Sequence, residues 1–244
     1  MPAQSGSSKV LAKMRRGYTR EVYDQLISRV REKIPDITIS SDFISGFCSE
    51  TEEDHLDTLS LLESVQYEQA FMFAYSMREK THAQYKLTDD VSEPEKLRRL
   101  QEVIATFRKH MVAKNQAEQD SLHLVLVEGP GRKSSSENPT WTGRTDGNKR
   151  CIFSADVQLS EFKTEDDVLE LLARGGLPPQ KSAGSSAVSK GIMTGDYVVV
   201  RVEECKGQTL YCRGVGVCSL TNFHKASERL LDREKWLDVD QGVF

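Results

Sequence analysis

Cys48 and Glu50 are the residues whose types and spacing could do chemistry in this sequence. They lie in ISGFCSETEED, residues 44–54, where a strand-like run ends at Gly46 and a cluster of acids opens an expected helix. A cysteine on such a turn could be a nucleophile, a metal ligand or a residue that fills a ligand-binding corner. A nucleophile needs a base, but the nearest histidine, His55, is expected more than one turn along the helix, with no third group to orient it. The stretch therefore favours binding over covalent catalysis, and we expect no catalytic residue in this chain.

The binding that this stretch predicts is that of a flat ligand. In parallel α/β sheets, ligands bind beyond the carboxyl ends of the strands, where the next helix begins, and residues 45–50 occupy such an end. Gly46 would let the backbone approach a ligand closely, and Ile44 offers an apolar contact to a ring. Glu50 has a second interpretation, because a carboxylate at the start of a helix is favoured by the helix dipole.

The five cysteines follow neither a disulfide pattern nor a metal-binding pattern. They stand at positions 48, 151, 205, 212 and 218 and include no Cys-x2-Cys pair, which argues against a disulfide framework or a structural zinc site and favours a reducing compartment. An iron–sulfur cluster needs converging thiolates, whereas Cys205, Cys212 and Cys218 are spread along two expected strands and beyond. We therefore expect no metal ligand and interpret the cysteines as buried or surface thiols.

The first half of the chain alternates expected helices and strands. Hydrophobic periodicity predicts helices over 7–16, 19–33, 51–65 and 94–119 and strands over 37–44 and 69–76. Such βα units build a parallel sheet with helices on one face. Thr38, Ser40 and Asp42 share the other face with Ile44, which indicates a barrel interior that holds a polar ligand. The alternative is a strand at the wet edge of a sheet.

The second half changes to short strands separated by turns. Asp146-Gly147 and Lys206-Gly207 are hairpin signals, so a small all-β barrel is expected. Residues 155–190 are interpreted as an insertion that holds a short helix and a Pro/Gly/Ser-rich stretch, and the last twenty residues favour one more helix. The predicted domains are therefore 1–119, 120–223 with this insertion, and a tail over 224–244.

The composition is that of a soluble protein of 244 residues, 38% hydrophobic and 29% charged. No window approaches the roughly 18 consecutive apolar residues of a membrane span, so no membrane partner is expected. The first residues form neither a secretory signal nor an organelle transit peptide, so without a resemblance a cytoplasmic location is expected.

Positive charge gathers in the expected barrel and in the helix before it. Basic groups on a small barrel can bind an RNA backbone, with affinity that falls as salt rises. The helix over 95–115 is also rich in Lys and Arg, and Trp141 or Phe153 could stack on a base, although a core position suits each of them better. The candidate RNA-binding residues are Arg132, Lys133, Arg144, Asn148, Lys149 and Arg150.

Four segments resemble a known family. MPAQSGSSKVLAKMRRGYT, SSDFISGFCSETEED and FAYSMREKTHA are similar to three successive motifs of the MiaB-type radical S-adenosylmethionine tRNA methylthiotransferases, and GRTDGNKRCIF is similar to the core of their TRAM domain. The motifs keep their order from the first residue to about residue 217. Cys48 stands where bacterial members have proline and Lys80 where they have glycine, and both departures suit the mitochondrial animal branch.

The resemblance implies an α/β fold: the C-terminal portion of a radical SAM partial (βα)6 barrel, followed by a small OB-like TRAM barrel. It implies a partial S-adenosylmethionine site and binding of a tRNA anticodon arm. It implies a substrate, a prenylated adenosine next to the anticodon of a tRNA. It also implies the product, a tRNA-2-methylthio-N6-isopentenyladenosine. The cofactor-binding residues carried over are Gln4, Ser5, Ser7, Asp42, Ile44, Gly46, Glu50, Ser76, Arg78 and Thr81.

The cluster ligands of the family are missing from this sequence, which bears on activity. The family holds a [4Fe–4S] cluster on a Cys-x3-Cys-x2-Cys loop and a second cluster in an N-terminal domain, and neither set of ligands is present in this sequence. We therefore expect a C-terminal fragment without the N-terminal half, inactive alone. The alternative is a non-catalytic module that binds RNA or a kinase regulatory subunit, a partner that the animal branch suggests. The animal branch also implies a mitochondrial location.

Overall fold

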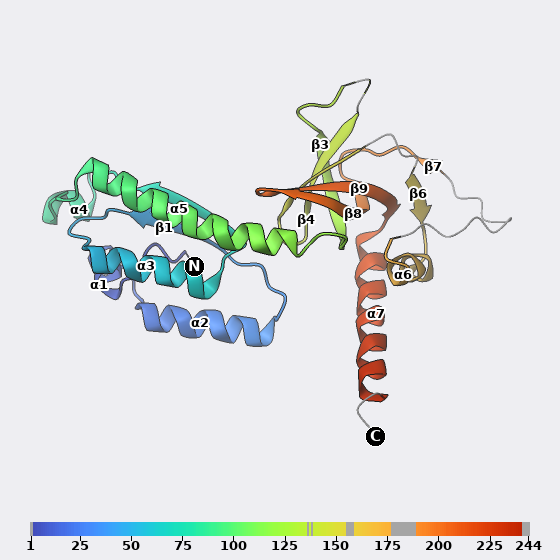
Figure 1. Ribbon diagram of the computed structural model, residues 1–244, viewed down its shortest axis with the longest axis horizontal. Helices are drawn as coiled ribbons and strands as arrows, with labels where there is room; N and C mark the ends of the chain where they lie inside the picture. The colour runs from blue at the N-terminus through green and yellow to red at the C-terminus, as the bar shows by residue number, and fades with distance from the viewer. Residues whose placement is uncertain (1, 136, 138, 155–158, 177–188, 241–244) are drawn as a thin grey trace. The chain divides into compact units, whose positions relative to one another are not determined.

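The computed structural model describes residues 2–135, 137, 139–154, 159–176 and 189–240 (Figure 1). The chain divides into two compact units, Met1–Lys114 and Asn115–Phe244, which we describe separately. Within the described residues, no helix is both long and apolar enough to cross a membrane.

The first unit is a parallel strand pair with helices on one face. Its elements are α1 (Ser8–Lys13), α2 (Arg20–Lys33), β1 (Ser40–Ser45), α3 (Glu52–Val65), β2 (Gln69–Ala74), α4 (His82–Lys86) and α5 (Glu93–Gln116), whose last two residues belong to the second unit. β1 and β2 pair in parallel, with Phe43 beside Met72. The predicted order of helices and strands is confirmed, although α5 ends three residues earlier than expected.

Side-chain caps explain where the helices begin. Thr51 forms a capping box with Asp54 at the start of α3, so the capping signal in the sequence is confirmed. Thr19 and Thr81 cap α2 and α4 with their hydroxyls, which accept from the backbone amides of Val22 and Gln84. At the other end of α3, Gln66 adopts a left-handed conformation with φ 52°, which stops the helix before β2.

The two faces of the strand pair differ in burial. Phe43 is fully buried in a core with Tyr67, Leu61 and Phe107 from the helices. Asp42 and Ile44 lie on the opposite face, beside Phe71 and Phe73, whose side chains are 56% and 54% exposed. The helices therefore cover one face, as predicted, and the other face of the described pair is open.

The second unit contains a five-stranded barrel. Its strands are β3 (Leu122–Pro130), β4 (Thr140–Thr145), β5 (Arg150–Ser154), β8 (Tyr197–Lys206) and β9 (Thr209–Cys218). They follow the order β5-β4-β3-β8-β9, and a parallel pairing of β5 with β9 closes the ring. The hairpin turns hold Asn148 and Gly207 at φ 58° and 57°, so the predicted hairpin signals are confirmed.

The predicted insertion contributes to the sheet. Its strand β6 (Leu159–Phe162) pairs in parallel with β9 and carries β7 (Ser189–Lys190) on its other side. The helix α6 (Glu165–Ala173) packs with α7 (Leu220–Asp240) in a second core that includes Phe162, Val168 and Phe223. The expected terminal helix is confirmed, and most of the Pro/Gly/Ser-rich stretch, 177–188, lies outside the described residues.

Candidate functional site

A pocket of about 220 Å³ in the first unit brings together three of the predicted ligand residues. They are Gln4, Ile44 and Thr81, which come from a segment before α1, from β1 and from the loop before α4. The remaining lining residues are Lys13, Met14, Arg15, Arg16, Phe47, His82 and Ala83. An apolar floor with cations at the rim suits a ligand that combines a ring with an anionic group.

Backbone pairing fixes one wall of this pocket. The Gln4 amide donates to the Asp42 carbonyl at 2.9 Å, and the Ile44 amide donates to the Gln4 carbonyl at 2.9 Å. The segment around Gln4 thus runs beside β1 as a short parallel bridge. Gln4 and Arg15 adopt left-handed backbone conformations with φ 65° and 58°, which are costly for non-glycine residues and gather at ligand sites.

The rim of the pocket is positively charged. None of the lining residues is acidic, and the Lys13 ammonium donates to the Ser49 carbonyl at 3.2 Å. Across the part of the chain that the structure describes, the side chains of Arg15 and Arg16 make no ion pair, and both residues are exposed. The rim can therefore accept a negatively charged group.

Ser5 and Ser7 are buried and serve the packing of α3 in this structure. The Ser5 and Thr58 hydroxyls lie 3.3 Å apart, and the Ser7 hydroxyl donates to Asp54 Oδ1 at 2.6 Å. Hydrogen bonds from Ser7 and Thr51 outweigh burial and lower the pKa of Asp54. Neither serine lines the pocket.

Gly46 and Glu50 form a buried structural corner. A Cβ at Gly46 would lie 2.3 Å from Lys96 Cγ, so the close neighbour that requires a glycine here is α5. The Glu50 carboxylate accepts from the Gly46 amide at 2.9 Å and from Arg99 Nη1 at 3.0 Å. Burial raises the pKa of Glu50, although both donors act against that rise.

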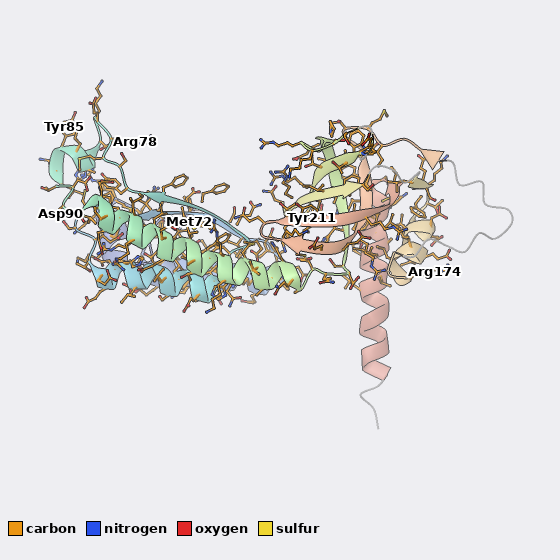
Figure 2. All side chains as sticks on the ribbon, turned by 45° about the horizontal axis from the view of Figure 1, so that its top comes forward. Met72, Arg78, Tyr85, Asp90, Arg174 and Tyr211 are labelled. Carbon is orange, nitrogen blue, oxygen red and sulfur yellow. The ribbon has the colours of Figure 1, made fainter. Side chains whose placement is uncertain are left out.

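The three remaining candidates of the first unit lie outside the pocket lining. Ser76 and Arg78 are exposed in the loop after β2, where Figure 2 labels Arg78. The Arg78 carbonyl accepts from the Thr81 hydroxyl at 2.8 Å, which shapes the loop that carries Thr81 to the pocket. Asp42 is half-buried on the open face of the strand pair.

Cys48 has the surroundings of a packing residue. Its side chain is fully buried beside Val10 and Phe47, and burial raises the pKa of its thiol. His55 points elsewhere, because its Nε2 lies 2.7 Å from Glu102 Oε2. A buried thiol with a raised pKa and no base beside it is a poor nucleophile.

The other cysteines are also distributed through packed strands. Cys151 and Cys212 lie in the barrel core, and the contact between them, together with burial, raises the pKa of Cys212. Among the described residues, no group of three His, Cys, Asp or Glu side chains could hold a metal ion. The cysteines that the structure describes are therefore too dispersed to fit an iron–sulfur cluster.

Some of the candidate RNA-binding side chains are exposed, and others are held by contacts within the barrel unit. Arg132 and Lys133 are exposed in the turn after β3, and Asn148 is exposed in the β4–β5 hairpin. Arg144 and Arg150 face each other across that hairpin. Two further contacts hold Arg144: Nε lies 3.5 Å from Glu128, and Nη1 donates to the Asn148 carbonyl at 3.1 Å.

Lys149 is committed to an internal ion pair. It is 9% exposed, and its ammonium lies 2.5 Å from Glu118 Oε1, while His123 Nε2 lies 2.7 Å from Glu118 Oε2. These contacts, with that of His123 the larger, lower the pKa of Glu118 to about 2. In this arrangement Lys149 anchors the hairpin to the segment before β3 and is not free to bind a phosphate.

Replacing Glu118 by Gln is expected to destabilise the second unit in a pH-dependent way. A carboxyl with a lowered folded-state pKa contributes stability above its unfolded value, and that contribution is lost as pH falls toward about 2. Because the group is partly solvent-screened, we expect a loss of only about 1–2 kcal/mol near neutral pH. Urea unfolding followed by tryptophan fluorescence measures it, and a loss that does not shrink on acidification would contradict the assignment.

The basic character predicted for the helix over 95–115 is largely neutralised in the structure. Lys96 pairs with Asp89 and Glu93 at 2.9 and 2.7 Å. Arg98 and Arg99 pair with acids of α3 and α5, Arg99 also with Glu50, and Lys114 pairs with Glu68. Of the Lys and Arg side chains that the structure describes on this helix, only Arg108 makes no ion pair. The positive charge of this helix is therefore largely balanced by neighbouring acids, and an RNA-binding role for the helix stays a prediction.

Comparison with known proteins finds close relatives among tRNA-modifying enzymes. No protein-family model matches the chain. The chain is 45% identical over 91% of its length to the human mitochondrial tRNA methylthiotransferase CDK5RAP1, and covers 32% of it. It is 52% identical over 64% of its length to the CDK5RAP1-like protein of Oryza sativa subsp. japonica, and covers 26% of it.

A bacterial relative extends the comparison. The chain is 45% identical over 66% of its length to the tRNA-2-methylthio-N(6)-dimethylallyladenosine synthase of Chloroherpeton thalassium, and covers 36% of that protein. The resemblance inferred from the sequence motifs is thus confirmed, and the chain spans about a third of the length of the curated relatives it matches.

Proposed function

We propose that this chain is the C-terminal part of a tRNA methylthiotransferase that acts on an adenosine next to the anticodon. The observation that carries the proposal is the 45% identity to the human mitochondrial enzyme over 91% of the chain. The animal relatives, which are mitochondrial enzymes by name, also support a mitochondrial location. The reaction itself is proposed to need the two thirds of the relatives' length that this chain does not cover.

In this proposal the first unit supplies one wall of an S-adenosylmethionine site, the remnant of a partial (βα)6 barrel. Gln4, Ile44 and Thr81 line one pocket, which supports their assignment to the cofactor. Ile44 would contact the adenine ring, while Gln4 and the Thr81 hydroxyl would hydrogen-bond polar groups. When bound, S-adenosylmethionine supplies the methyl group and, with an iron–sulfur cluster, the radical. The described residues do not fit a cluster, so the proposed role of this chain's residues is to bind and orient S-adenosylmethionine.

The barrel of the second unit is proposed to be a TRAM domain that binds the anticodon arm. Its cations Arg132, Lys133, Arg144 and Arg150, of which the first two are exposed and the last two half-buried, would contact phosphates together with Asn148. Lys149 would act through the hairpin that it anchors. A second candidate, an RNA-binding module without catalysis, is favoured by the dispersed cysteines, four of which are buried. No observation favours a module that binds a kinase regulatory subunit.

The double variant Arg144→Ala/Arg150→Ala tests the RNA-binding part. Phosphate contacts release counterions, so we expect binding of an anticodon stem-loop to weaken about tenfold and the salt slope to fall by about two. Fluorescence anisotropy across a salt series measures both quantities. Lys149 stays in place, because its replacement would damage the hairpin as well as remove a charge.

The matched control is Arg108→Ala/Arg174→Ala, which removes the same charge from α5 and from the end of α6. Arg174 makes only an exposed surface pair with Glu170 at 3.0 Å. The control should bind as the unaltered protein does. Equal affinity and equal salt slope in the hairpin variant would remove Arg144 and Arg150 from the interface.

A further inference from the structure

The outward face of the barrel where β4, β5 and β9 lie side by side presents an ordered row of side chains. The register places Thr142 opposite Ile152 and Ile152 opposite Tyr211. Their chain neighbours Cys151, Phe153, Leu210 and Cys212 are buried inside the barrel. Since side chains alternate along a strand, Ile152 and Tyr211 point outward together.

Tyr211 is the outward aromatic ring of this barrel. Its side chain is 37% exposed, whereas Phe153 is 1% exposed in the core and Trp141 packs against that core. Tyr197 packs against the layer of α6 and α7. Among the aromatic rings that the structure describes on the five barrel strands, Tyr211 alone is exposed. Figure 2 labels this residue.

Arginines flank this ring on the same face. Arg213 follows Tyr211 by two residues on β9, and Arg150 precedes Ile152 by two residues on β5. The Cα of each arginine lies about 7 Å from the Cα of Tyr211, because residues two apart on a strand are about 6.8 Å apart and diagonal neighbours on adjacent strands about 7–8 Å. Long arginine side chains bridge such distances.

Like charges meet across the strands on this face. Arg150 lies directly opposite Arg144, and Arg213 directly opposite Arg201, arrangements that are destabilising on their own. Arg201 pairs with Asp120 at 2.9 Å and Arg144 lies 3.5 Å from Glu128. In the described part of the chain, Arg150 and Arg213 have no side-chain hydrogen bond or ion pair. An anion placed beside each of these two arginines would relieve the repulsion from the arginine opposite it.

Lys206 adds a further cation at the ring itself. Its ammonium lies 5.3 Å from the Tyr211 ring centroid and 2.7 Å from Glu204 Oε2. A base that stacks on the ring would displace the ammonium toward an adjoining phosphate. The face thus combines an apolar and aromatic centre with cations on both sides.

We propose that this face binds unpaired RNA, with a base stacked on Tyr211 and Ile152 and the flanking phosphates on Arg150 and Arg213. The inference rests on the proposed function in taking RNA as the ligand, and it adds the mode of recognition. Bases inside a duplex are already stacked and cannot reach a side chain, whereas loop bases can. The face therefore selects a single-stranded loop over a stem.

The test compares two RNA probes of equal length, a stem-loop and a fully paired duplex, bound to the full chain and measured by fluorescence anisotropy. We expect the unaltered protein to prefer the stem-loop. Tyr211→Ala should weaken stem-loop binding about tenfold and leave duplex binding unchanged, since one stacked base contributes about that much. Tyr211→Phe keeps the ring and should bind within about twofold of the unaltered protein.

The control is Tyr85→Ala, which removes a tyrosine that is 69% exposed on α4 and should change neither affinity. If Tyr211→Ala has no effect, weakens both probes equally, or behaves as Tyr211→Phe does, the stacking proposal is overturned while RNA binding stands. If the unaltered protein binds neither probe, the proposed function itself fails.

Discussion

Replacing Gly46 by Ala is expected to destabilise the first unit by about 2–5 kcal/mol. The backbone at Gly46 has φ 78°, and a side chain in this left-handed region costs about 1–2 kcal/mol. The new Cβ would also lie 2.3 Å from Lys96 Cγ and 3.2 Å from Lys96 Cα, which adds about 1–3 kcal/mol of overpacking. Lys96 cannot turn away cheaply, because it is 1% exposed and its ammonium is held by Asp89 and Glu93.

Amide hydrogen exchange of β1 and β2, read by mass spectrometry, measures this loss within the unit concerned. The strands of the second unit serve as an internal reference, and their protection should not change. Gly17→Ala is the matched control, since a Cβ there meets nothing within 4 Å and should cost little. Unchanged protection of β1 in Gly46→Ala would mean that α5 does not hold this corner.

Local patterns predicted the elements of the fold because the signals that set them are local. The alternation around Phe43 identified a strand with one core face, and the spacing of Thr51 and Asp54 identified the start of α3. Asp146-Gly147 and Lys206-Gly207 identified two hairpins of the barrel. The insertion was harder to interpret, because β6 gains its place only by pairing with β9, more than fifty residues later.

The roles of the charged residues could not be predicted in the same way. Lys149 has the sequence surroundings of an exposed hairpin cation, yet its partner Glu118 lies 31 residues earlier. Glu50 stands at a helix start, yet its buried partner Arg99 lies 49 residues later. Tyr211 did carry a local signal, because it alternates with the apolar Leu210 and Cys212 between the cations Lys206 and Arg213.

Replacing Arg99 by Met is expected to destabilise the first unit by about 3–5 kcal/mol near neutral pH, because it leaves the buried Glu50 carboxylate without its cation. The two side chains are 6% and 2% exposed, and Arg99 Nη1 also donates to the Glu50 carbonyl at 2.9 Å. The double variant Glu50→Gln/Arg99→Met removes the charge together with its partner and keeps an acceptor for the Gly46 amide. It should recover most of the lost stability, as hydrogen exchange of β1 can measure.

The pH dependence separates this cause from a simple loss of packing. Burial already raises the pKa of Glu50, and removing Arg99, which acts against that rise, should raise it further. A folded state whose carboxyl has a raised pKa binds the proton more tightly than the unfolded chain, so folding is favoured as pH falls through that value. The cost of Arg99→Met should therefore shrink between about pH 7 and pH 5, whereas the double variant, which lacks this carboxyl, should show no such recovery. An equal cost at both pH values would place the effect in the lost packing of the Arg99 side chain instead of in the buried charge of Glu50.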